Sequence, residues 1–61
     1  MPLIFVHWNS GRTVDQKRSL AKAITDAVVE HARVTPEATT IYFREMERDE
    51  VSVGGVLQSD E

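Results

Sequence analysis

Three features of this sequence predict an α/β fold in which one long helix connects two parallel strands. Two segments rich in β-branched and aromatic residues, 3–8 and 39–46, enclose a longer segment with helical periodicity, 13–32. Strands joined through a helix lie parallel, with a right-handed crossover. A glycine pair between valines near the C-terminus predicts a short hairpin. We therefore expect one domain over residues 1–61, a small βαβ unit with a C-terminal hairpin.

The first strand is expected over Leu3–Trp8, where apolar residues are almost continuous. Such a run is typical of a strand that is covered on both faces, so we expect its outer face to be buried too. His7 and Trp8 are neighbours on this strand and should point to opposite faces. The Asn-Ser-Gly sequence that follows favours a turn.

The helix is expected to run from about Thr13 to Ala32. Thr13 and Gln16 fit a capping box, in which the threonine side chain caps the helix and the glutamine returns a bond. The apolar positions follow the spacing of one buried stripe: Leu20, Ala21, Ile24, Ala27, Val28 and His31.

The rest of the chain is expected to alternate turns and strands. Thr35 and Pro36 are typical of the start of a short helical turn, with proline at the first position. The second strand follows over 39–46, and the charged residues 47–50 are expected to form a solvated loop. Residues 51–57 should form the hairpin around the glycine pair.

The chain is too short to bury a large core alone. It has 61 residues, no cysteine and two histidines, so we expect neither disulfides nor a structural zinc site to supply the stability that such small domains need. Two parallel strands are also not stable alone in water. We therefore expect a homo-oligomer in which dimerisation extends the sheet to four strands and the hairpin packs on a neighbour.

Charge and hydropathy exclude several classes of partner. Seven basic and ten acidic residues give a net charge of −3, and the basic residues are scattered, whereas nucleic-acid binding depends on concentrated positive charge. No apolar run is long enough for a membrane span, and no signal-like leader is recognisable. We expect a soluble, cytoplasmic protein without nucleic-acid or membrane partners.

Pro2 is the first candidate for chemistry. Methionine aminopeptidases remove Met1 when the second residue is small, which would leave Pro2 as an N-terminal secondary amine. Burial beside apolar strands and a nearby cation would lower the pKa of this amine and give a base near neutral pH. The alternative, which Pro2 taken alone favours, is a proline that only precedes an edge strand.

Arg12 comes one residue before the expected helix cap. A helix N-terminus carries about half a positive charge, so a cation is unfavourable there unless an anion completes the arrangement. A guanidinium together with free helix N–H groups would bind a carboxylate. The alternative is an arginine that lies across the surface toward Asp15.

The order and spacing of these features resemble the 4-oxalocrotonate tautomerase family over essentially the whole chain. The resemblance is carried by Pro2 before a short apolar strand and by four further motifs: Gly11-Arg12-Thr13, Asp15-Gln16-Lys17, Glu45-Met46 and Gly54-Gly55. It implies βαβ protomers, dimers with a four-stranded sheet, and commonly hexamers. It also implies that Pro2 is the base and Arg12 the carboxylate-binding arginine.

Two departures from the family bear on the substrate. Family members of the best-known type have a second arginine, from a neighbouring subunit, where this chain has Thr40, and an aromatic residue where it has Val51. Thr40 can donate one neutral hydrogen bond but cannot hold a second carboxylate. Arg44 lies too far along the strand to replace that arginine, and Arg48 in the loop has more freedom. Each is more often a solvated residue than a site residue.

The aromatic residues and His7 have both structural and functional interpretations. Trp8 could form an apolar wall of the pocket, although core packing is the commoner role. His7 has no second ligand at suitable spacing, so we expect a packed or hydrogen-bonded residue and no metal site. Tyr42 and Phe43 are expected to pack in the sheet, with one of the two facing any pocket beside Thr40.

The resemblance and the residues together favour a cofactor-free tautomerase acting on a small 2-hydroxydienoate or 2-oxo carboxylate. Pro2 would move the proton and Arg12 would bind the carboxylate, while Thr40, Val51 and Trp8 would contact the substrate. With one clear arginine, a monocarboxylate fits better than a dicarboxylate.

Two alternatives to a tautomerase stay open. Related proline-dependent dehalogenases and hydratases use an additional arginine and an acidic residue, and this chain has Asn9 and Val53 at the corresponding positions. A non-catalytic oligomer that binds a metabolite is the other alternative, because the second arginine and the aromatic residue are missing.

Overall fold

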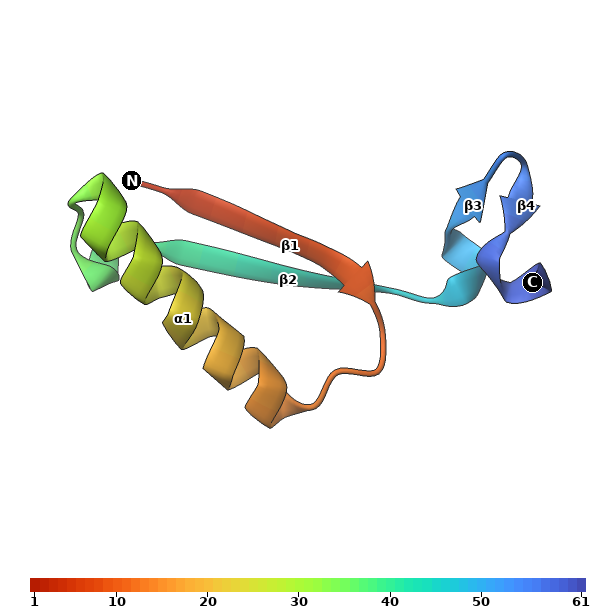
Figure 1. Cartoon of the computed structure of the whole chain (residues 1–61), viewed down its shortest axis with the longest axis horizontal. Coiled ribbons are helices and arrows are strands. Elements are labelled where there is room, and N and C mark those ends of the chain that lie inside the picture. The colour runs from red at the N-terminus through yellow and green to blue at the C-terminus, as the bar shows by residue number, and fades with distance from the viewer.

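Two parallel strands and one helix form the main body of the molecule, which a computed structural model describes over residues 1–61. The elements are β1 at Leu3–Asn9, α1 at Val14–Ala32 and β2 at Thr40–Met46, with a short 3-10 turn at Pro36–Ala38 before β2. β1 and β2 pair in parallel, and α1 connects them (Figure 1). The predicted βαβ unit is confirmed, with β1 ending one residue later than expected.

The start of α1 follows directly from its sequence. The Thr13 Oγ1 atom accepts a hydrogen bond of 3.1 Å from the Gln16 N–H, and the Gln16 Oε1 atom accepts one of 2.9 Å from the Thr13 N–H. These two bonds form the expected capping box. At the other end Arg33 has a φ of 56° and donates its N–H to the Val29 carbonyl, so the chain leaves the helix in a left-handed conformation.

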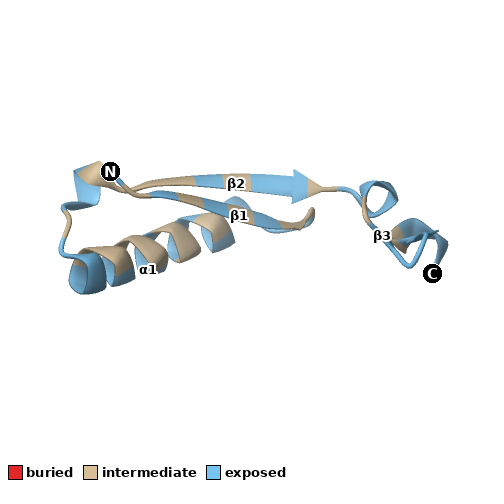
Figure 2. Ribbon diagram, turned by 90° about the horizontal axis from the view of Figure 1, so that it is seen from above, coloured by how far each residue is buried: buried red, intermediate tan, exposed pale blue.

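The helix covers only one face of the sheet (Figure 2). Side chains alternate along each strand, and those that point toward α1 are half-buried: Ile4, Val6, Trp8, Ile41 and Phe43. The opposite face, hereafter the open face, leaves 55% of Leu3, 49% of Phe5 and 48% of Tyr42 exposed. His7 lies on the open face and Trp8 on the helix side, so the two point to opposite faces, as predicted.

The apolar stripe of α1 was predicted correctly except at its margins. Four of the expected residues are half-buried: Leu20, Ala21, Ile24 and Val28. Ala27 and His31 are exposed, so their predicted burial is wrong. The covered stripe of the helix is centred on the direction in which Val28 points, and Ala27 lies beyond its edge. His31 belongs to the last turn of the helix.

The last 15 residues, 47–61, form a separate arm that projects beyond the end of β2 (Figure 1). Within this C-terminal arm, β3 at Ser52–Val53 and β4 at Val56–Leu57 pair antiparallel, which confirms the predicted hairpin. Gly54 and Gly55 have φ values of 60° and 85°, the conformation that a tight hairpin turn requires. Residues 47–50 are exposed, as expected for the solvated loop, and residues 48–50 of it form a 3-10 turn in which the Glu50 side chain accepts a hydrogen bond from the Glu47 N–H.

No residue of the single chain is fully buried. The cover expected for the outer face of β1 is therefore not supplied by the chain itself, and the arm adds further exposed apolar side chains, with 76% of Val53 accessible. α1 is not apolar enough over a sufficient length to cross a membrane.

Candidate active site

The candidate site residues lie at two separate ends of the sheet. Pro2 immediately precedes β1, and Arg12 follows its last residue by three positions. β1 has seven residues, which span about 23 Å at roughly 3.3 Å per residue. Thr40 begins β2 beside Pro2, whereas Trp8 lies near Arg12 and Val51 lies in the C-terminal arm. One chain thus does not bring the predicted residues together, and it encloses no pocket.

The Pro2 end is held mainly by the backbone. The Pro2 carbonyl accepts a hydrogen bond of 3.1 Å from the Thr40 N–H, which extends the ladder between β1 and β2. Pro2 and Thr40 are both half-buried. The Thr40 side chain shares the open face with Tyr42, while Phe43 points toward α1. Of the two aromatic residues, Tyr42 is therefore the one on the same side as Thr40.

At the opposite end, the Arg12 guanidinium lies over the Trp8 ring, 5.3 Å from the ring centroid. Arg12 makes no ion pair within the chain. The alternative in which it reaches Asp15 is wrong, because Asp15 pairs with Arg18 at 2.8 Å. Arg12 is therefore an exposed cation whose hydrogen-bond donors are not used by a neighbouring carboxylate.

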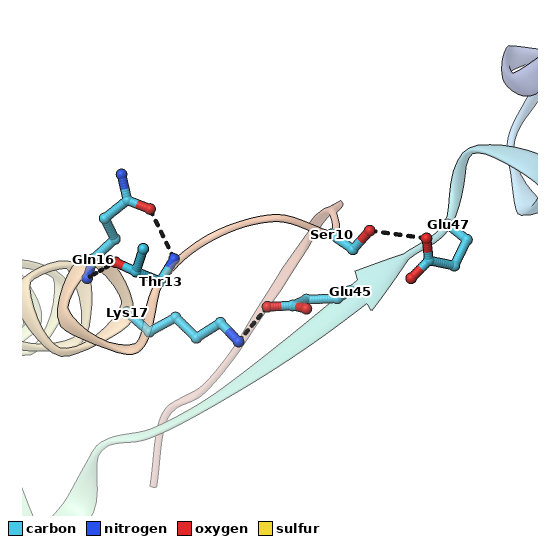
Figure 3. Close-up of polar contacts among 6 residues, drawn as sticks. All are labelled: Ser10, Thr13, Gln16, Lys17, Glu45 and Glu47. Carbon is cyan, nitrogen blue, oxygen red and sulfur yellow. Dashed lines mark hydrogen bonds and ion pairs between the residues drawn. The ribbon is translucent and has the colours of Figure 1, made fainter.

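The Glu45 carboxylate, which lies near the start of α1, also has a cationic partner within the chain. Glu45, the residue of β2 that lies opposite Trp8, forms an ion pair with Lys17 (Figure 3). The two side chains are only 31% and 28% exposed, so this contact between α1 and β2 is better shielded than the other ion pairs of the helix. Because Lys17 neutralises Glu45, the positive charge of Arg12 stays available for a ligand.

Lys17 and Glu45 were not identified as a pair from the sequence alone. A signal was present, because Lys17 stands on the stripe that also carries Ala21, Ile24 and Val28. A lysine at such a half-buried position commonly has an anionic partner. The partner could not be named, since it lies on the second strand, 28 residues further along.

The start of α1 adds donors to this end of the sheet. The capping box satisfies the N–H groups of Thr13 and Gln16. The N–H groups of Val14 and Asp15, in the first turn, have no carbonyl partner within a helix. Together with the free Arg12 guanidinium they form a cationic and hydrogen-bonding surface suited to a carboxylate.

The C-terminal arm is tied to the same end through Gln58. The Asn9 Nδ2 atom donates to Gln58 Oε1 at 2.7 Å, and the Arg48 Nη2 atom donates to the Gln58 carbonyl at 2.8 Å. The Gln58 N–H in turn donates to the Val51 carbonyl at 2.7 Å. Arg48 is therefore less free than the sequence suggested, and the role of Gln58 had no signal in the sequence.

Two further predicted residues lie outside both ends. Arg44 is exposed on the open face, opposite His7 in the register of the two strands. His7 is exposed as well and stacks against Phe5 with ring centroids 6.3 Å apart. No cluster of three or more His, Asp or Glu side chains is placed to hold a metal ion.

Comparisons of the sequence and of the structure with known proteins both identify tautomerases as relatives. The sequence profile of the tautomerase enzyme family matches residues 2–61. The 2-hydroxymuconate tautomerase of Bacillus subtilis is 37% identical over 60 residues, covering 98% of this chain and 97% of its own. Among solved structures, a homologue of 4-oxalocrotonate tautomerase superposes with a TM-score of 0.93 at 35% identity, with 98% of both chains covered. A heterohexameric 4-oxalocrotonate tautomerase from Chloroflexus aurantiacus superposes with a TM-score of 0.87 at 25% identity, covering 98% and 97%.

Proposed function

This chain belongs to the 4-oxalocrotonate tautomerase family, and from that premise we propose that Pro2 and Arg12 carry out proton transfer on a small carboxylate. The chain is an isomerase with tautomerase activity, as its family and relatives are. We propose the roles of its individual residues and the class of its substrate. We also propose that residues 1–61 form a single tautomerase domain.

Pro2 is the proposed general base. Once Met1 is removed, its nitrogen is a secondary amine that takes the proton from the enol hydroxyl while the oxygen becomes a carbonyl. The protonated amine then returns the proton to carbon, so the substrate is isomerised without net loss of atoms. Removal of Met1 is essential to this role, because the nitrogen of an internal proline belongs to an amide and is not basic.

Arg12 is the proposed carboxylate-binding residue, and its lack of an anionic partner is the observation that carries the proposal. Asp15 is engaged by Arg18 and Glu45 by Lys17, so neither competes with a substrate for the guanidinium. A bidentate contact with Arg12 would fix the substrate carboxylate and stabilise the charge that develops as the enol loses its proton.

The two residues would act together across a subunit boundary. They lie at opposite ends of β1, so a two-fold axis that pairs β1 antiparallel with β1 of a second copy would bring Pro2 of one chain beside Arg12 of the other. The same pairing extends the sheet to four strands and gives cover to edges that the chain leaves bare. We propose a homo-oligomer built from such dimers, assembled as a hexamer.

The proposed substrate carries one carboxylate. Thr40 stands beside Pro2 and offers one neutral donor, so the base end lacks the cation that a second carboxylate would need. A 2-hydroxydienoate or 2-oxo acid with a single carboxylate, such as the enol phenylenolpyruvate, fits this arrangement better than the dicarboxylate 2-hydroxymuconate. Val51, half-buried in the C-terminal arm, would contribute an apolar contact from a neighbouring copy.

A rate assay on both enols, combined with intact-mass measurement, tests the proposal. Protein lacking Met1 should isomerise phenylenolpyruvate with a higher kcat/KM than 2-hydroxymuconate. Protein that retains an uncleaved N-terminal tag should be inactive on both, because its Pro2 nitrogen is acylated. Equal turnover by tagged and processed protein would contradict the role of Pro2, and a preference for 2-hydroxymuconate would contradict the substrate class.

A further inference from the structure

We infer that Trp8 is a positioning residue for Arg12, an inference that rests on the function proposed above for that arginine. Within one chain Trp8 lies at the opposite end of β1 from Pro2, and its side chain points toward α1. Its contact is with the Arg12 guanidinium, at 5.3 Å from the ring centroid. Because its ring is engaged by the guanidinium, we assign the tryptophan an action on the substrate through the arginine and not as a wall of the pocket.

The indole ring is itself held in place. On the helix side of the sheet it stacks on Phe43, with ring centroids 5.5 Å apart and an interplanar angle of 26°. A half-buried ring fixed in this way presents a stationary face to the guanidinium, and a cation over the face of tryptophan is attracted by the ring quadrupole. Phe43, Trp8 and Arg12 thus form one continuous stack from the sheet to the surface.

This contact orders Arg12 without using its donors. A carboxylate partner would occupy the N–H groups of the guanidinium and would compete with the substrate, whereas a ring face leaves all of them free. An exposed arginine without any partner would instead lose side-chain freedom each time a substrate bound, which weakens binding. The stack avoids both costs, because the side chain is ordered before the carboxylate arrives.

The choice of indole supports this interpretation. The Trp8 Nε1 atom is buried and has no hydrogen-bond partner in the chain, so the indole N–H gains no bond that phenylalanine would lack. What tryptophan adds at this position is a larger ring face, and tryptophan is the best of the aromatic side chains for binding a cation in this way.

A double-mutant cycle on phenylenolpyruvate isomerisation separates positioning from packing. Trp8→Leu should lower kcat/KM about two- to five-fold, mainly through KM, which is the size expected for one partly exposed cation–π contact. The same change made in the Arg12→Ala protein should cause no further loss, since no guanidinium remains to be ordered. Trp8→Phe keeps an aromatic face and should lose less than Trp8→Leu.

Val6→Ala is the matched control, because Val6 lies on the same strand and the same face, is likewise half-buried, and has no aromatic ring to offer a cation. It should cost the same fold in both backgrounds. Equal losses from Trp8→Leu in the two backgrounds would mean a packing or substrate contact and would overturn the inference alone. An Arg12→Ala protein with unchanged kcat/KM would overturn the proposed function and this inference with it.

Fluorescence gives a readout that does not depend on turnover. Trp8 is the only tryptophan of the chain, so the emission comes from this residue alone and reports on its surroundings. Arg12→Ala should change the intensity or wavelength of the emission, whereas Lys22→Ala, which removes an exposed cation paired with Asp26, should not. Emission that responds to neither substitution would overturn the contact between the guanidinium and the ring.

Discussion

The two ends of the sheet are organised in different ways. At the Arg12 end, the cation–π stack, the capping box and the Lys17–Glu45 ion pair fix the start of α1 against β1 and β2. At the Pro2 end, the first residues are held by one backbone hydrogen bond, from the Thr40 N–H to the Pro2 carbonyl. The proposed carboxylate-binding half is thus ordered within one chain, while the proposed base half is left open for another copy to complete.

This difference follows from the chemistry that each half would perform. An arginine binds a carboxylate well when its geometry is fixed in advance, and one chain can supply that order. An amine becomes a neutral base only when its surroundings disfavour its charge. The single chain leaves Pro2 half-buried and Met1 90% exposed, so the proposed role of Pro2 as the base requires further cover from the assembly.

The largest effect is expected at the base. Pro2→Ala should lower kcat by about 10²- to 10⁴-fold, the usual contribution of a positioned general base, and should leave the oligomeric state unchanged in size-exclusion chromatography. Since alanine would still present an N-terminal amine, a residual rate that rises with pH is expected. Full activity in the Pro2→Ala variant would contradict the proposal that Pro2 is the general base.

The next largest effect is expected at the carboxylate-binding half. Arg12→Ala should lower kcat/KM by about 10²- to 10³-fold, because the role proposed for the residue includes stabilising charge in the transition state as well as binding the ground state. Lys22→Ala removes a cation from α1 and should change neither kcat nor KM. Similar losses in both variants would point to a general electrostatic effect of net charge.

A substitution at Thr40 should change the charge of the Pro2 end and with it the preference between monocarboxylate and dicarboxylate substrates. Thr40→Arg places a cation beside Pro2 and should raise kcat/KM for 2-hydroxymuconate relative to phenylenolpyruvate about tenfold, as a charged hydrogen bond to a second carboxylate can provide. The comparison of the two substrates is internal to each protein, so it does not depend on expression level. An unchanged ratio would argue against Thr40 as a determinant of substrate charge.

A smaller effect is expected from loosening the ordered end. Lys17→Met should lower the free energy of unfolding by about 1 kcal/mol or less, because the Lys17–Glu45 pair is partly shielded. It should also raise KM modestly, since the freed Glu45 carboxylate would compete with the substrate for Arg12. Thermal denaturation and steady-state kinetics would measure the two effects, and the double variant Lys17→Met with Glu45→Gln should recover KM.

The smallest effect is expected for the exposed pair on the outer side of α1. The Lys22 Nζ atom donates a hydrogen bond to the Asp26 carboxylate, and this bond raises the pKa of Lys22 above 10.5. A raised pKa contributes stability below 10.5 that is lost only as pH rises through the folded value, so this pair should give no pH dependence of unfolding near neutrality. Because both side chains are largely exposed and such pairs contribute little, Lys22→Ala should change the melting temperature at pH 7 only slightly, and a clear decrease would show that this surface is covered in the assembly.

The sequence predicted best what neighbouring residues decide among themselves. The capping box of Thr13 and Gln16 and the Gly54-Gly55 turn depend on a few adjacent residues, and both were predicted correctly. The separation of Pro2 from Arg12 was not among these predictions, although it follows from their places on either side of one strand. Such features need no knowledge of tertiary packing.

What the sequence could not predict depends on how the elements lie against one another. The exposure of Ala27 and His31 reflects the rotation of α1 on the sheet, and the pairing of Lys17 with Glu45 joins residues far apart in the chain. The contact of Arg12 with Trp8 required the path of the intervening turn. The second half of the proposed site depends on a neighbouring copy and cannot be derived from one sequence alone.

Subunit complementation tests the central claim, that Pro2 and Arg12 of different chains form one site. Pro2→Ala and Arg12→Ala chains, each nearly inactive, would be mixed in equal amounts, dissociated and reassembled, and assayed with phenylenolpyruvate. Random pairing of two chain types across a two-fold interface should restore about a quarter of the wild-type activity. A mixture no more active than the two variants measured separately would contradict the claim.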